Sequence, residues 1–196
     1  RALLDAAEHY SKARIPGASV RCAALAALVA EQLRHPNIRL IGLNATQARH
    51  LMTHHGQFDV TLAIARGYGL DSADNWTTTV YQQAVVRGNV QFVKRMQALG
   101  LRATPLVADL ITLYRRDNSA TSQAQIGARK ANLQFLLREL IDDVVHLHDI
   151  CVSLDFKVMA QYCRQSRALQ YLRPGNNNNN NNGNNNSATR TQEKSS

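Results

Sequence analysis

The chain has 196 residues, 44% of them hydrophobic, and its 23 Lys or Arg against 14 Asp or Glu give a formal net charge of +9. This length and composition are ordinary for one globular domain with a real core. The longest apolar run near the start, Cys22 to Ala30, is about half of what a bilayer requires, so the sequence predicts neither a membrane span nor a signal peptide.

The basic excess leaves nucleic acid, acidic lipid and acidic proteins open as partners. Arg and Lys are scattered among acidic and neutral residues, however, which favours a solvated surface over one binding patch. The three cysteines are an odd number without paired spacing, which is typical of reduced thiols in a cytosolic or nuclear protein.

Apolar spacing predicts the first helices. The first helix has Leu3, Ala7 and Tyr10 on one face, is expected to be cut at its start, and ends at Ile15-Pro16-Gly17. A wide apolar stripe predicts a second helix from Ser19 to Arg34. Asn37 to Leu43 is ambiguous between a buried loop and a short strand, and we expect the loop because an isolated strand leaves its backbone unpaired. A capping arrangement at Asn44 and Gln47 predicts a short helix to about His54.

The next stretch contains one short pattern twice. Gly56-Gln57-Phe58 and Gly88-Asn89-Val90 start 32 positions apart, and each opens an apolar-periodic run that stops at a Gly-Leu pair. Three helices are predicted here, Gln57 to Tyr68, Asp74 to Arg87 and Asn89 to Leu99. The unit of helix, turn, helix and turn has the period of helical-repeat solenoids.

In the last part of the chain, Thr104-Pro105 predicts the start of a helix, and the polar stretch from Arg116 to Gln125 predicts a mobile loop. A long helix is predicted from about Ala128 to Leu147, and a short one from about Asp155 to Gln165. From Arg173 onward, Pro-Gly and two Asn runs cannot supply a core, and this tail is predicted to be disordered.

The fold prediction is therefore all-α, a right-handed α-solenoid-like array of about eight to nine antiparallel helices. Residues 1–172 would form the helical-repeat domain and residues 173–196 the disordered Asn-rich tail. A chain that opens on Arg1 is expected to be a fragment of a longer solenoid. The residues predicted to lie in the core are Trp76, Tyr81, Leu110, Leu136, Leu140 and Val144.

No chemical site is predicted. His146, His148 and Cys151 fall within six residues, with His54 and His55 elsewhere, but a structural zinc site needs four ligands with tight pair spacing. The adjacent carboxylates Asp142 and Asp143, and also Asp149 and Asp155, should diverge on a helix and not form a catalytic pair. The chain has no Gly-x-Ser-x-Gly elbow and no glycine-rich phosphate loop. We therefore expect no enzyme, no cofactor and no small-molecule substrate, and the residues that bind a partner stay unassigned.

A basic helical-repeat module that binds RNA is the alternative from another class. Such a code requires equivalent polar side chains at equivalent repeat positions. The two copies offer Asp59 against Gln91 and Arg66 against Ala98, which disfavours nucleic acid.

Three stretches resemble the C-terminal region of the spatacsin family. They are Leu3-Leu-Asp-Ala-Ala-Glu-His-Tyr-Ser-Lys-Ala13, Phe58 to Tyr68, and, most specifically, Trp76-x3-Val80-Tyr81-Gln82-Gln83-Ala84-Val85-x-Arg87-Gly88-Asn89. The resemblance runs from about Leu3 to Tyr162, is loose from Ile15 to Leu43, and does not extend to the Asn-rich tail.

The resemblance implies a very large, mostly α-solenoid cytosolic scaffold, peripheral to late endosomes and lysosomes. Its implied partners are a spastizin-type FYVE-domain protein and the fifth adaptor-protein complex, through which it would reach membranes. Its implied roles are lysosome organisation, lysosome reformation during autophagy and axon maintenance, and the family is associated with hereditary spastic paraplegia. It implies no catalytic or metal-binding residue for any position of this chain.

Overall fold

The computed structural model describes residues 1–101 and 103–172. Within these residues every regular element is helical, with ten α-helices, one π-helical segment, one 3-10 segment and no strand. The all-α prediction is therefore confirmed for this part of the chain. The Asn-rich segment from Arg173 onward, predicted to be disordered, lies outside the described residues.

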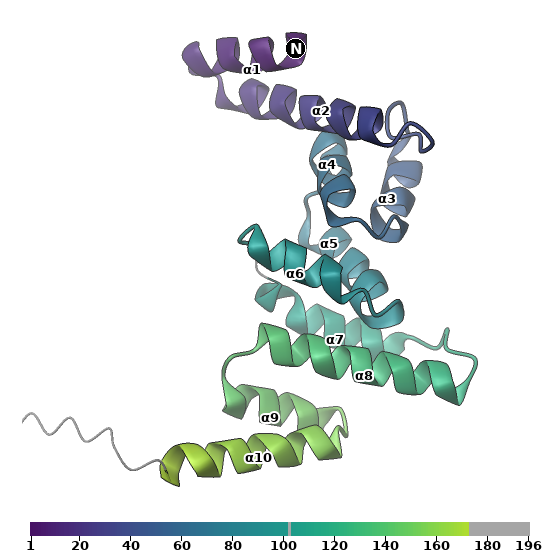
Figure 1. The fold of residues 1–196 in the computed structure, drawn as a ribbon, viewed down its shortest axis with the longest axis vertical. Helices are drawn as coiled ribbons and strands as arrows, with labels where there is room; N and C mark the ends of the chain where they lie inside the picture. Colours follow the sequence, from purple (N-terminus) through teal and green to yellow (C-terminus); the bar gives the residue numbers. More distant parts are fainter. Residues whose placement is uncertain (102, 173–196) are drawn as a thin grey trace, which may run out of the picture.

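The elements follow one another along the long axis of the molecule, with α1 and α2 at one end and α10 at the other (Figure 1). The first seven are α1 (Ala2–Lys12), α2 (Pro16–Arg34), α3 (Ala45–His54), α4 (Phe58–Tyr68), α5 (Ala73–Val80), the π-helical η1 (Tyr81–Val86) and α6 (Val90–Ala98). The remaining five are the 3-10 segment η2 (Thr104–Leu106), α7 (Val107–Arg116), α8 (Gln123–Leu140), α9 (Val144–Ser153) and α10 (Lys157–Leu172).

Local sequence signals set several helix ends. The Asn44 side chain accepts a hydrogen bond from the Gln47 amide, and the Gln47 side chain accepts one from the Asn44 amide, so the predicted capping box is confirmed. Gly69 ends α4 in the left-handed conformation, with φ of +66°, where a residue with a Cβ would be strained.

The predicted helix from Ala128 to Leu147 is wrong, because the structure divides it into α8 and α9. Ile141, at the end of α8, has an extended backbone, and the Asp143 carboxylate accepts a hydrogen bond from the Val145 amide at 2.9 Å. An N-cap side chain of this kind starts a new helix. The break adds one helix, so the described residues contain ten instead of the predicted eight to nine, and it leaves Val145, in the first turn of α9, 41% exposed.

Two other predicted elements also differ. The helix from Asp74 to Arg87 forms α5 and then widens into η1, where the backbone takes the π-helical form. The final helix is longer than the predicted range from Asp155 to Gln165. By contrast, residues 37–43 contain no strand, which confirms the loop, but within them only Leu40 is buried, and Asn37, Arg39, Ile41 and Gly42 are exposed.

Two hydrophobic clusters form the core. The smaller one lies around α2, α3 and α4, and it contains Leu28, Leu40, Met52 and Ile64. The larger one extends from α4 to α10. Trp76 packs against both clusters and so joins the two halves of the core.

The predicted core residues are confirmed at four positions, since Tyr81, Leu110, Leu136 and Leu140 are buried. Trp76 and Val144 are half-buried and pack against the larger cluster. Four leucines of α8, Leu133, Leu136, Leu137 and Leu140, are buried together. At roughly 1.5–3 kcal/mol for each such side chain, α8 is a principal source of stability in the C-terminal half.

Candidate functional site

A polar network surrounds η1, inside the stretch that most specifically resembles a known family. The Tyr81 hydroxyl donates a 2.6 Å hydrogen bond to the Asp117 carboxylate, and the Arg129 guanidinium donates to the same oxygen. The Asp117 and Arg129 side chains are only 12% and 13% exposed. This ion pair, with Tyr81, ties the polar segment between α7 and α8 to the core.

Hydrogen bonds fix the charge state of this network. Burial alone would raise the pKa of Asp117, but donors on Ser119 and Tyr81 and the charge of Arg129 lower it to about 2. The pKa of Tyr81 is raised, by burial first and then by its hydrogen bond to Asp117. Near neutral pH the pair is therefore a carboxylate and a neutral phenol, and neither group can act as a general acid or base.

The other side of η1 is connected to the turn between α3 and α4. The Gln83 side chain is fully buried and donates a 2.6 Å hydrogen bond to the Thr53 carbonyl. The Asn89 side chain donates to the Gly56 carbonyl at 2.8 Å, and the Arg87 guanidinium donates to a carbonyl at the end of α3. These polar side chains satisfy backbone carbonyls at the end of α3 and in the turn that follows it, so their role is to stabilise the fold.

Two close contacts complete the centre. The rings of Trp76 and Phe58 stack with centroids 5.8 Å apart, and Phe58 meets Phe92 edge-on at 5.1 Å. Gly88 has a φ of +67°, and a Cβ at this position would lie 3.0 Å from Asn132, whose side chain donates to the Val85 carbonyl. The central network is therefore a packing centre, and it holds no convergent reactive groups.

The metal-ligand candidates of α9 do not converge. Cys151 is completely buried, whereas His146 is exposed. The His148 Nε2 atom accepts a 3.0 Å hydrogen bond from Arg164, which assigns the ring proton to Nδ1, 3.2 Å from the Asp149 carboxylate. Within the described residues, no three His, Cys, Asp or Glu side chains are placed to hold a metal ion.

The other histidine pair is also separated. The His54 ring stacks on His50, with centroids 4.3 Å apart, while the His55 ring lies edge-on to His35 at 5.9 Å. The buried Nδ1 atom of His55 has no hydrogen-bond partner. Burial and the neighbouring His35 lower the pKa of His55, so its ring is neutral at neutral pH.

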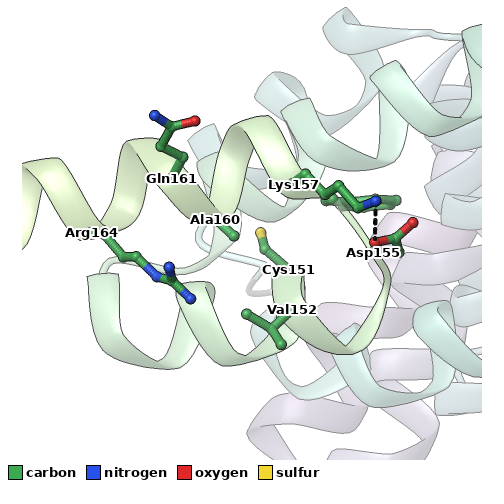
Figure 2. Close-up of a pocket in the computed structure, with 8 residues that line it drawn as sticks. Cys151, Val152, Asp155, Lys157, Ala160, Gln161 and Arg164 are labelled. Atoms are coloured by element: carbon green, nitrogen blue, oxygen red, sulfur yellow. Dashed lines mark ion pairs between the residues drawn. The ribbon is translucent and has the colours of Figure 1, made fainter.

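A groove of about 400 Å³ lies between α9 and α10. Among the residues that line it, the Cys151 side chain points toward Ala160 (Figure 2). Burial raises the pKa of the Cys151 thiol to about 11, and burial also raises that of Cys163. Both thiols therefore stay protonated and are poor nucleophiles. The groove's carboxylate, Asp155, lies 3.8 Å from the Lys157 amine, and both side chains are exposed.

The four carboxylates singled out in the sequence have separate surroundings. Asp143 caps α9, Asp149 contacts His148, and Asp155 pairs with Lys157. Asp142 is exposed on the loop before α9. Paired carboxylates for acid and base catalysis are not formed by these residues.

The repeat positions compared for an RNA code do not form a row. Asp59 and Gln91 both line a groove of about 500 Å³, and Asp59 is engaged by Arg95 at 3.3 Å. Arg66 instead lines a different groove of about 970 Å³, between α2 and the end of α4. Ala98 is exposed and lines neither groove. A regular ladder of base-reading side chains is therefore not present at these positions.

Sequence reasoning missed the partners of the central network. Asp117 lies in a segment predicted to be a mobile loop, and Arg129 lies at the start of a predicted helix. Asn132 lies on the same helix, which was predicted from its apolar residues. Their roles depend on contacts over 12 to 47 positions of sequence, which a local pattern does not encode. The opposite charges of Asp117 and Arg129 were the one sequence feature that could have suggested an ion pair between these residues.

Comparisons with known proteins identify a relationship over the first part of the chain. A family model described as "Spatacsin C-terminus" matches residues 1–116. A protein of Dictyostelium discoideum is 31% identical over 122 residues, which are 62% of this chain and 3% of that relative. The chain therefore spans only a small part of this relative's length. No solved structure gives a significant match. None of the described helices is long and apolar enough to cross a membrane.

Proposed function

The chain belongs to the spatacsin C-terminal family, and on this premise we propose that it is a non-enzymatic helical scaffold of lysosomal and late-endosomal trafficking. The family match over residues 1–116 is the observation that carries the proposal. The proposed role is protein–protein interaction in lysosome organisation, in the reformation of lysosomes during autophagy and, in neurons, in axon maintenance.

The arrangement proposed for the scaffold is an α-solenoid. Two observations support it: α1 packs on α2, α3 on α4 and α9 on α10, and the elements follow the long axis in chain order (Figure 1). Because each unit of a solenoid contacts only its neighbours, such a chain presents extended surfaces to partners.

The structure also supports a role without catalysis. The titratable groups of the central network are held in fixed charge states by their neighbours, and the polar side chains around η1 satisfy backbone groups. The residues from Trp76 to Asn89, which carry the family resemblance, serve packing, and this is consistent with a scaffold. The proposed partners are a spastizin-type FYVE-domain protein and the fifth adaptor-protein complex, and the proposed location is the cytoplasmic face of late endosomes and lysosomes.

The proposal is tested by co-purification. The tagged chain, expressed with a spastizin-type protein, should retain that protein and subunits of the fifth adaptor-protein complex at physiological salt. An unrelated helical-repeat protein of similar net charge is the control, because it reports non-specific basic binding. Recovery of both partners above the control supports the proposal, and recovery equal to the control contradicts it.

A further inference from the structure

An apolar surface lies in the C-terminal part of the chain, after the region that the family model matches. We call it the C-terminal groove. It has a volume of about 370 Å³ and is lined by eight residues: Ala131, Gln134, Phe135, Arg138, Leu147, Val158, Met159 and Tyr162. Residues of α8 form one wall and residues of α10 the other, with the buried Leu147 of α9 between them.

The groove exposes more apolar surface than the fold requires. Phe135 is 39% exposed, Val158 82% and Tyr162 54%. The leucines that bury α8 occupy another face of this helix, so Phe135 is not needed for the core. A contiguous exposed patch of large apolar side chains is typical of a surface that another molecule covers.

The residue types also favour a protein partner. Tyr, Phe, Met and Arg are enriched in protein interfaces, and Tyr and Arg are frequent among the residues that dominate binding energy. The groove contains Phe135, Arg138, Met159 and Tyr162 together. Its volume suits a few inserted side chains better than a complete cofactor.

The spacing of the wall suits a helix. The α8 residues of the groove stand at intervals of three and four, from Ala131 to Arg138, and so follow two turns on one face, roughly 10 Å. A partner helix lying along this wall would insert apolar side chains at the same helical spacing between α8 and α10. This is the common mode in which an amphipathic helix binds a hydrophobic groove.

The charge of the groove indicates the charge of the occupant. Arg138 is the one ionisable cation among the lining residues, and none of the lining residues is acidic. Its guanidinium lies over the Tyr162 ring at 5.5 Å from the centroid, and Arg138 is exposed. A carboxylate on the partner could therefore form a bidentate pair with Arg138, and the +9 charge of the chain would accelerate the approach of an acidic molecule.

From this geometry we propose that the C-terminal groove binds an acidic amphipathic helix of a partner protein. Apolar side chains at helical spacing enter between Phe135 and Tyr162, and an acidic side chain pairs with Arg138. The proposal rests on the interaction role proposed above and adds a site outside residues 1–116. A second copy of the chain is a poor occupant because its net charge has the same sign.

A library of random peptides displayed on phage, selected on the full immobilised chain, tests this inference without either proposed trafficking partner. The enriched peptides should be acidic, with apolar residues three and four positions apart. Each is then synthesised and titrated by fluorescence anisotropy against the wild-type chain and against Arg138→Glu and Tyr162→Ala. Both variants should bind about tenfold more weakly, or worse.

Matched controls separate the site from general effects. Arg49→Glu makes the same charge change on an exposed arginine of α3, and Tyr10→Ala removes an exposed tyrosine of α1. Both should bind the peptides as the wild type does. Replacing the acidic residues of a selected peptide by Arg should restore its binding to Arg138→Glu. Equal thermal unfolding, followed by circular dichroism, confirms that each variant is folded.

Three results with peptides would overturn the proposal: no enriched peptides, enrichment of peptides without acidic residues, or unchanged binding by Arg138→Glu and Tyr162→Ala. A chain that binds phosphatidylserine vesicles and no peptide would also overturn it, and would assign the groove to a membrane surface. Because the selection contains no spastizin-type protein, its failure leaves the co-purification result unaffected, and the two proposals fail independently.

Discussion

At the scale of single residues, the ion pair of Asp117 and Arg129, whose side chains are 12% and 13% exposed, links several elements. It connects the segment after α7 to α8, and through the Tyr81 hydroxyl it also holds η1. Removing one partner of such a pair leaves the other charge buried without compensation, which costs more than the pair contributes.

Asp117→Asn should therefore lower the free energy of unfolding by roughly 2–4 kcal/mol, because Arg129 loses its carboxylate. Tyr81→Phe removes a single hydrogen bond to a charged acceptor and should cost about 1.5–3 kcal/mol. Urea unfolding followed by circular dichroism measures both. Midpoints equal to the wild type for both variants would show that the network does not stabilise the fold.

His55 predicts a pH dependence. Its pKa in the folded chain lies below the ordinary value of 6.5, because burial and His35 disfavour the charged ring. The unfolded chain therefore binds a proton more readily as the pH falls through 6.5, and the folded state loses stability in that range. The stability contribution of the neutral ring is complete above this value.

Proton NMR should place the His55 titration midpoint below 6.5. His35→Gln removes the neighbouring charge and should move that midpoint upward, whereas His9→Gln, at an exposed position far along the chain, should leave it unchanged. A His55 midpoint at or above 6.5 in the wild type would contradict the burial of its ring.

At the scale of elements, the division between α8 and α9 depends on one N-cap. The Asp143 carboxylate accepts from the Val145 amide, while Asp142 next to it is exposed. Asp143→Ala should lower the free energy of unfolding by about 1 kcal/mol, and Asp142→Ala, the matched control, by less than about 0.5 kcal/mol. Equal losses in the two variants, measured by thermal unfolding, would show that Asp143 does not cap α9.

Two glycines should respond in opposite directions to the same substitution. Gly88→Ala places a Cβ 3.0 Å from Asn132 at a φ of +67° and should cost more than about 1 kcal/mol. Gly127→Ala, inside α8, meets nothing within 4 Å and should stabilise the chain by about 0.5–1 kcal/mol. Urea unfolding of both variants decides this, and a stabilising Gly88→Ala would contradict the close approach of α8 to η1.

The helices also show which parts of the fold could be predicted from the sequence. Apolar periodicity, the capping box at Asn44 and the glycines that end helices are local signals, and they predicted most helices correctly. The break after Leu140 was missed because the apolar pattern continues through it, so only the side-chain cap distinguishes two helices from one.

The candidate sites show the same limit. The separate surroundings of His146 and His148 could be anticipated, since residues two positions apart point to different sides of a helix. The C-terminal groove could not be anticipated, because it is formed by side chains of three helices that tertiary packing brings together. Exposed apolar residues such as Phe135 and Tyr162 follow the same helical spacing as core residues.

At the scale of the whole molecule, the family match covers residues 1–116, whereas the C-terminal groove lies between α8 and α10. The larger hydrophobic cluster extends across this boundary, from Phe58 to Cys163. Residues on both sides of this boundary therefore share the larger cluster, and a change that destabilises this cluster should affect the family-matched part and the C-terminal groove together.

Direct titration of the purified chain with a purified spastizin-type FYVE-domain protein tests the central claim most directly. We expect saturable binding at physiological salt, with single-stranded RNA binding only at low salt, because the basic charge of the chain is dispersed over its surface. Absence of binding to the protein by a folded chain, together with tight, salt-sensitive binding to RNA, would contradict the scaffold and favour a nucleic-acid-binding repeat.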